Sequence, residues 1–144
     1  MREWTSRPSD TVLIVDDHLD TLECLAEIVS ERGLRPLLAT NGRQALELLG
    51  RLNGPCLILL DLFMPVMDGF QFLRALERYE SSGDYPVVVM TASNSVTPIH
   101  SSVVARLNRP FRLEDVHWVL DHLDPSSRAP PLTGSAPPPQ LDLW

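Results

Sequence analysis

Short apolar runs separated by segments of helical periodicity are the feature that most constrains the fold of this chain. The run from Cys56 to Leu60 contains only apolar residues, which is typical of a parallel β-strand covered on both faces of its sheet. Between the runs, apolar residues recur at intervals of three and four, as they do on one face of an α-helix. Five strands are expected, the last from a weaker pattern: Thr11–Val15, Leu34–Ala39, Cys56–Leu60, Pro86–Met90 and Ala105–Asn108.

A helix is expected after each strand. The helical segments begin near residues 19, 42, 70, 97 and 113, and the fourth, which starts at Thr97-Pro98, must be short. Alternation of strands and helices predicts an α/β fold in which helices cover both faces of a parallel sheet. Pro36 cannot donate a hydrogen bond to a neighbouring strand, so the Leu34–Ala39 strand is expected at an edge of that sheet.

Charge and composition exclude several classes of function. The chain has 144 residues and a net charge of −7, which argues against non-specific binding to nucleic acid or to an anionic membrane. No segment resembles a signal peptide or a membrane span, and Cys24 and Cys56 lack metal-ligand spacing, so we expect a cytoplasmic protein. We expect an extension over residues 1–9, one domain over 10–124, and a disordered, proline-rich tail over 125–144.

Three acidic residues and one threonine stand where the predicted strands end. Asp16 and Asp17 follow the first strand, Asp61 follows the third and Thr91 the fourth. The carboxyl ends of parallel strands share one edge of the sheet, which is where such sheets bind ligands. Carboxylates about 4 Å apart repel by roughly 4 kcal/mol at an effective dielectric constant near 20. Carboxylate ligands of this kind suit Mg²⁺, which commonly engages phosphate, so the pattern predicts Mg²⁺ with a phosphoryl group. A carboxylate can also act as the nucleophile in phosphoryl transfer. Arg109, at the end of the last predicted strand, would supply positive charge around the phosphoryl oxygens.

Four segments together resemble the receiver domain of two-component response regulators. VLIVDD is similar to the first strand and acidic pair of that family, and DLFMPVMDG to its phosphoacceptor segment. VVVMTA is similar to the fourth strand with its switch threonine, and NRPF to the segment that usually reads Lys-Pro-Phe. The resemblance covers about residues 10 to 124, and the spacing of Asp17, Asp61 and Thr91 agrees with the family.

The resemblance implies a flavodoxin-like, doubly wound fold of five parallel strands in the order 2-1-3-4-5. It implies that Asp61 accepts a phosphoryl group from a sensor histidine kinase or a histidine phosphotransfer protein in a phosphorelay. Asp17, Asp61 and the backbone carbonyl of Phe63 would bind Mg²⁺, and Asp16 would hold a metal-bound water. Thr91 would act as the switch residue. The output would be contact with a downstream protein, and the only reactions would be self-phosphorylation and self-dephosphorylation.

Three features depart from the family pattern. Arg109 stands where the family has a lysine before Pro110, and its planar head group is not equivalent to an ammonium. Arg106 stands where the family usually has an aromatic residue, and we expect it to be exposed. The stretch from Thr91 to Arg109 is shorter than usual, which predicts a shortened fourth helix. The resemblance also implies a cis peptide bond before Pro110.

One other interpretation stays open, and two more lack a residue or segment that they would need. The departures at Arg109 and Arg106 are compatible with a pseudo-receiver, a protein-binding module that works without phosphorylation. An aspartate-nucleophile phosphohydrolase would need a second acid two residues after Asp61, where Phe63 stands. A dinucleotide-binding domain would need a GxGxxG segment after the first strand, and none is present.

Overall fold

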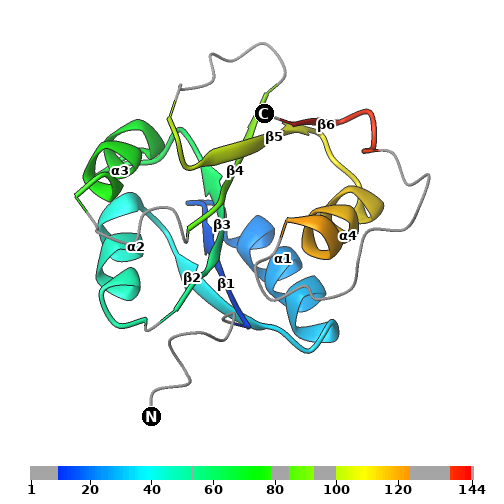
Figure 1. Ribbon diagram of the computed structural model, residues 1–144, viewed down its shortest axis with the longest axis horizontal. Coiled ribbons are helices and arrows are strands. Elements are labelled where there is room, and N and C mark those ends of the chain that lie inside the picture. The colour runs from blue at the N-terminus through cyan, green and yellow to red at the C-terminus, as the bar shows by residue number, and fades with distance from the viewer. Residues whose placement is uncertain (1–9, 53, 79–84, 93–99, 124–136, 144) are drawn as a thin grey trace.

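The computed structural model describes residues 10–52, 54–78, 85–92, 100–123 and 137–143. Six strands in these ranges form one sheet in the order β2-β1-β3-β4-β5-β6 (Figure 1). The strands are β1 (Thr11–Val15), β2 (Arg35–Ala39), β3 (Leu57–Asp61), β4 (Val87–Ala92), β5 (Val103–Arg109) and β6 (Leu141–Leu143). The first five pair in parallel, whereas β6 is antiparallel to β5. The predicted flavodoxin-like order 2-1-3-4-5 is therefore confirmed, with one strand added at its end.

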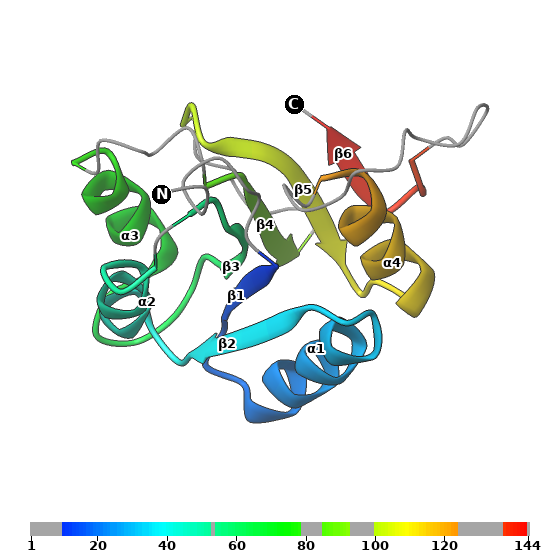
Figure 2. The same ribbon diagram turned by 60° about the horizontal axis from the view of Figure 1, so that its bottom comes forward.

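Helices cover both faces of the sheet, as the alternating pattern predicts. The helices α1 (Leu19–Glu31) and α4 (Leu113–His122) lie on one face, and α2 (Gly42–Leu49) and α3 (Gly69–Leu76) lie on the other (Figures 1 and 2). Each pair of helices encloses its own hydrophobic cluster against the sheet. The short helix expected from Thr97-Pro98 falls within residues 93–99, outside the described part of the chain.

The central strands contribute side chains to both clusters. Along β1, Leu13 and Val15 point into the cluster beneath α2 and α3, whereas Val12 and Ile14 point into the one beneath α1 and α4. Alternate residues of a strand point to opposite faces, so a strand with both faces covered must be apolar throughout. The unbroken apolar pattern of β1 and β3 thus follows from their place at the centre of the sheet.

The strand β2 lies at an edge, where Pro36 was expected to place it. Among the described strands β2 pairs with β1 alone, and only Ala39 of its five residues is fully buried. Proline is tolerated there because the outer side of an edge strand has no ladder hydrogen bonds to lose.

The loop from β3 to α3 is fixed by several backbone contacts. Asp68 and Gln71 cap α3 reciprocally, the amide of Met67 donates to the carbonyl of Pro65 at 2.8 Å, and Val66 takes a φ of 70°. The amide of Gly42 at the start of α2 donates to the carbonyl of Met67 at 2.8 Å. A three-residue turn with positive φ is strained and persists only where its surroundings hold it.

The expectation of a disordered tail is wrong for residues 141–143. These residues form β6, and the side chain of Leu141 is 5% exposed within the cluster beneath α1 and α4. Composition argued for disorder because a proline-rich segment buries little apolar area by itself. The segment gains its order from β5, which offers an unpaired edge for it to join. None of the helices in the described ranges has the length and hydrophobicity that a bilayer crossing demands.

Gly69 should resist replacement by any larger residue. A Cβ atom there would lie 2.7 Å from the carbonyl oxygen of Asp61 and 2.8 Å from Cα of Leu62, both of them backbone atoms that cannot turn aside. Gly69→Ala should therefore lower the free energy of unfolding by roughly 1 to 3 kcal/mol, measured by urea titration.

Gly50→Ala is the matched control for this measurement. Gly50 has a helical backbone conformation, and its nearest neighbour would lie 3.6 Å from the added Cβ. The substitution should be neutral or stabilising by up to about 1 kcal/mol. Equal losses in the two variants would contradict the close-contact explanation.

Candidate functional site

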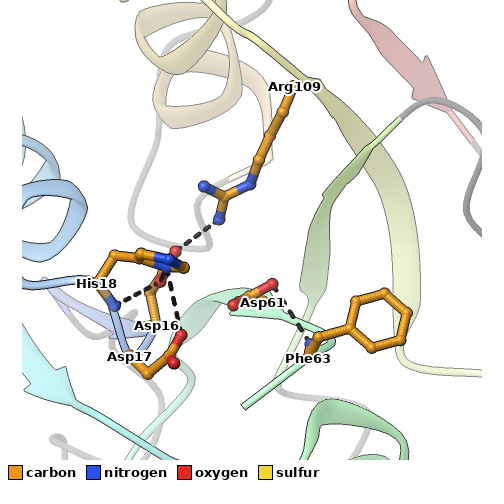
Figure 3. Close-up of polar contacts among 6 residues, drawn as sticks. All are labelled: Asp16, Asp17, His18, Asp61, Phe63 and Arg109. Atoms are coloured by element: carbon orange, nitrogen blue, oxygen red, sulfur yellow. Dashed lines mark hydrogen bonds and ion pairs between the residues drawn. The ribbon is translucent and has the colours of Figure 1, made fainter.

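Three carboxylates meet at the carboxyl edge of the sheet. Val15 of β1 pairs with Leu60 of β3, so the next residues along each strand, Asp16 and Asp61, come side by side. Oxygen atoms of Asp16, Asp17 and Asp61 lie within 4.8 Å of one another, together with a ring nitrogen of His18 (Figure 3). The sequence-predicted acidic residues are thus brought together by parallel strand register.

Burial makes this cluster energetically demanding. Asp16 is fully buried and Asp61 is 7% exposed. The pKa of Asp61 is raised to about 6, mainly by burial and then by the nearby charge of Asp16. The charge of Arg109 and the amide of Phe63, which donates to Asp61 Oδ1 at 3.4 Å, act in the opposite direction. Asp61 therefore titrates close to neutrality, unlike an ordinary surface aspartate.

Arg109 supplies positive charge to the site. It is the last residue of β5, and its Nη2 lies 2.5 Å from Asp16 Oδ2 (Figure 3). Its guanidinium also lies over the ring of Phe111, 5.8 Å from the ring centroid. The peptide bond from Arg109 to Pro110 is cis, as the family resemblance implied. The positive charge expected from the sequence is therefore present, and the guanidinium of Arg109 is held by the buried carboxylate of Asp16, directly after β1.

His18 also lies at the acidic cluster, at the start of the turn into α1. Its side chain is 69% exposed, but Nδ1 lies 3.0 Å from Asp16 Oδ1 and 3.3 Å from Asp17 Oδ1. The hydrogen bond with Asp16 raises the pKa of His18, and the charges of both aspartates add to this effect. Its backbone amide also donates to Asp16 Oδ1 at 2.9 Å. The available signal was its place directly after the acidic pair, where the chain turns into α1.

Thr91 and Phe63 flank the carboxylates. Asp61 pairs with Met90, so Thr91 stands one residue beyond Asp61 on the neighbouring strand. Thr91 is 2% exposed, and its hydroxyl has no hydrogen-bond partner among the described residues. Phe63 is 59% exposed, and its ring points away from Asp61 (Figure 3). The ring meets that of Phe70 edge-on, with 6.0 Å between the ring centroids. A buried hydroxyl without a partner is destabilising, so it is available to a ligand oxygen.

Arg106 differs from the expectation of an exposed side chain. Its side chain is 21% exposed, and its Nη2 lies 2.8 Å from Asp142 of β6. Because β6 could not be foreseen from composition, neither could this pairing.

The donor set of the acidic cluster suits a hard divalent cation. Three carboxylates within ligand-sharing distance provide the oxygen ligands that Mg²⁺ prefers. Asp17 Oδ1 is buried and accepts no hydrogen bond from the described residues, although Nδ1 of His18 lies 3.3 Å from it. The residues present therefore fit Mg²⁺, and His18 stands beside them as a nitrogen donor that such an ion does not need.

Comparison with known proteins identifies the family. The model of the response regulator receiver domain matches residues 12–115. The chain belongs to the response regulator receiver family. As a receiver, it is 34% identical over 109 residues to the response regulator MprA of Mycolicibacterium vanbaalenii, a match that covers 73% of this chain and 46% of MprA. The chain thus spans about half the length of the first curated relatives that it matches.

Two further relatives are closer to this receiver in length. Sporulation initiation phosphotransferase F of Bacillus subtilis is 29% identical over 112 residues, which cover 75% of this chain and 88% of the relative. A CheY-like receiver domain protein of Methanospirillum hungatei has a crystal structure with a TM-score of 0.67 and 29% identity, covering 75% of this chain and 88% of that one. Both the sequence and the fold therefore place the acidic cluster in a receiver domain.

Replacement of Asp61 should stabilise this receiver when no metal is bound. Between about pH 4 and pH 6 the folded protein keeps a proton on Asp61 that the unfolded chain has released, so stability falls as pH rises through this window. Above about pH 6 Asp61 is ionised in both states, so the full cost of burying its charge lowers the free energy of unfolding. Asp61→Asn should then raise the free energy of unfolding by about 1 to 3 kcal/mol at pH 8, and by much less at pH 4.

Urea titration in EDTA at the two pH values measures this difference. Asp10→Asn removes an exposed carboxylate just before β1 and serves as the control, with no comparable gain at pH 8. A less stable Asp61→Asn variant at pH 8 would show that repulsion within the cluster is not the dominant effect.

Proposed function

We propose that this receiver is a phosphoacceptor signalling protein of a two-component system or phosphorelay in the cytoplasm. Asp61 takes a phosphoryl group from a sensor histidine kinase or a histidine phosphotransfer protein in a Mg²⁺-dependent reaction. The new charge alters a surface that binds a downstream protein. The chain acts on no other substrate, apart from gaining and losing its own phosphoryl group. The convergence of Asp16, Asp17 and Asp61 within 4.8 Å at the sheet edge carries this proposal.

The transfer itself is a nucleophilic substitution at phosphorus. An oxygen of Asp61 forms the new P–O bond while the P–N bond of phosphohistidine breaks, and the electron pair of that bond stays on the imidazole nitrogen. Asp61 must be ionised to attack. With a pKa of about 6 it is mostly ionised at neutral pH, and as a buried group it carries little hydration that must be lost. The site thus presents a poorly solvated carboxylate to the donor.

Charge has to be balanced around the transferred group. Mg²⁺, when bound, offsets the charge of the carboxylates and of the phosphoryl oxygens. Asp17, Asp61 and the backbone carbonyl of Phe63 would bind it, and Asp16 would act through a water molecule. Arg109 already stands beside Asp16 and contributes a second fixed charge. The hydroxyl of Thr91 is buried and unpaired within the described structure, so a phosphoryl oxygen would give it a partner.

The relatives support this assignment. One is named a phosphotransferase of sporulation initiation, and it matches this chain over most of its own length. A receiver domain dimer of NtrC4, 30% identical to this chain and with a TM-score of 0.65, has a solution structure described as beryllofluoride-activated. Beryllofluoride is therefore a suitable probe for Asp61 in this receiver.

Acetyl phosphate with Mg²⁺ should add one phosphoryl group to the wild-type chain, seen in the intact mass. Asp61→Asn and Asp61→Ala should not gain this mass, and EDTA should abolish the gain in the wild type. Asp10→Asn should behave like the wild type, because Asp10 is exposed and lies before β1. If acetyl phosphate, beryllofluoride and cognate kinases all give no Asp61-dependent change, the chain is a phosphorylation-independent binding module instead.

Arg109 should set the rate of this reaction. The charge of Arg109 offsets that of Asp16 and lowers the pKa of Asp61, and Arg109→Ala removes it. The rate of phosphorylation by acetyl phosphate should therefore fall about 10- to 100-fold in this variant. Arg109→Lys keeps the charge but not the planar geometry, and should give an intermediate rate. Arg74→Ala on α3 is the control at an exposed arginine. An unchanged rate in Arg109→Ala would remove this residue from the mechanism.

A further inference from the structure

The strand β6 occupies the outer edge of β5, beyond the five strands that the family pattern predicts. Leu141 pairs with Leu107, Asp142 with Arg106, and Leu143 with Ala105. The amide of Asn108 also donates to the carbonyl of Gln140 at 2.7 Å. Figures 1 and 2 show β6 lying beside β5 at the end of the sheet. A segment far along the sequence thus covers a strand edge that would otherwise be open to pairing.

Two kinds of side-chain contact hold β6 in place. Leu141 is 5% exposed within the hydrophobic cluster beneath α1 and α4. Asp142 Oδ2 accepts hydrogen bonds from Arg106 Nη2 at 2.8 Å and from Asn108 Nδ2 at 3.2 Å. The hydrogen bond from Asn108, and then that from Arg106, lower the pKa of Asp142, which indicates that both favour the ionised carboxylate. The carboxylate of Asp142 is the polar anchor of the strand.

This attachment is small compared with the rest of the sheet. The strand β6 has three residues, Leu143 is 47% exposed, and the side chain of Asp142 is also 47% exposed. Elements with few buried contacts open at the low end of the range of local stabilities. Loss of a single anchor should therefore shift the balance between docked and undocked β6 measurably.

Asn108 connects this attachment to the candidate site. It is paired across the ladder with Thr91 and is followed along β5 by Arg109. Both neighbours are residues that a phosphoryl group on Asp61 would engage. In the docked state the hydroxyl of Thr91 and the Oδ1 atom of Asn108 are both buried, and neither has a hydrogen-bond partner among the described residues. Movement of either neighbour toward the site therefore changes the surroundings of Asn108, one of the two β5 side chains that donate to Asp142.

We propose that the outer edge of β5 is a binding site for the chain's own residues 139–143 and that phosphorylation of Asp61 weakens this binding. The inference rests on the phosphoacceptor function proposed above. When Thr91 and Arg109 turn toward the phosphoryl group, Asn108 shifts with them and its hydrogen bond to Asp142 is lost. The strand β6 then leaves β5, and the edge of the sheet is uncovered. Because coupling is reciprocal, β6 docking must oppose phosphoryl binding by the same factor.

Amide hydrogen exchange on the full chain tests this coupling. With Mg²⁺ and saturating beryllofluoride, exchange in residues 137–143 and along β5 should become at least about fivefold faster than in Mg²⁺ alone. Asp142→Asn should give a similar increase without beryllofluoride. By linkage, the same variant should bind beryllofluoride several-fold more tightly than the wild type. Binding is followed separately by ¹⁹F NMR, with Asp61→Asn to identify signal that does not come from this site.

Asp121→Asn is the matched control. Asp121 of α4 pairs with Arg32 at the end of α1 and belongs to neither β5 nor β6, so this variant should leave β6 exchange and beryllofluoride affinity unchanged. Asp61-dependent binding with unchanged β6 exchange would overturn the coupling alone. Unchanged affinity in Asp142→Asn would do the same. Absence of Asp61-dependent binding would overturn the phosphoacceptor function as well.

Discussion

Repulsion between the buried carboxylates of Asp16 and Asp61 is the constraint on which the rest of this structure depends. Parallel pairing of β1 with β3 forces the two residues together, and the hydrophobic clusters on both faces keep water away from them. The fold cannot relieve this repulsion by moving either strand without losing its core. It is relieved instead by added positive charge and by protons, and burial together with the charge of Asp16 raises the pKa of Asp61 to about 6.

Arg109 and His18 respond to the same charge in different ways. Arg109 lies close to Asp16 in a partly buried contact and stacks on Phe111, so its position is defined from two sides. His18 reaches the acidic pair from solvent and keeps most of its surface exposed. A guanidinium cannot release its proton in a protein, whereas an imidazole can. Arg109, at the end of β5, therefore supplies a permanent positive charge, whereas the charge of His18 at the surface depends on pH.

Much of this arrangement follows from the sequence, because the positions of the strands and of their ends are local properties, whereas the strand order was implied by the family resemblance. Apolar runs locate β1 and β3, Pro36 places β2 at an edge, and the acids follow directly from where the strands end. What sequence reasoning missed depends on contacts between distant segments. The strand β6 is three residues long and gains its order only from β5, and the pairing of Arg106 with Asp142 spans 36 positions. The contact of His18 with Asp16 and Asp17 could not be foreseen either, because it depends on how the chain turns after β1.

The contacts around the β3–α3 loop give the acidic site one fixed wall. Gly69 lies against the backbone of Asp61, Gly42 bonds to Met67, and Asp68 closes the cap of α3, so the backbone on this side is held at several points. Across the site, the hydroxyl of Thr91 has no partner among the described residues, and Arg109 reaches the site on a long side chain. A displacement that begins at Asp61 is therefore expected to move β4 and β5 more than the β3–α3 loop. The β3–α3 loop would then be the fixed part of the receiver, and the β5 edge of the sheet would be the part that moves.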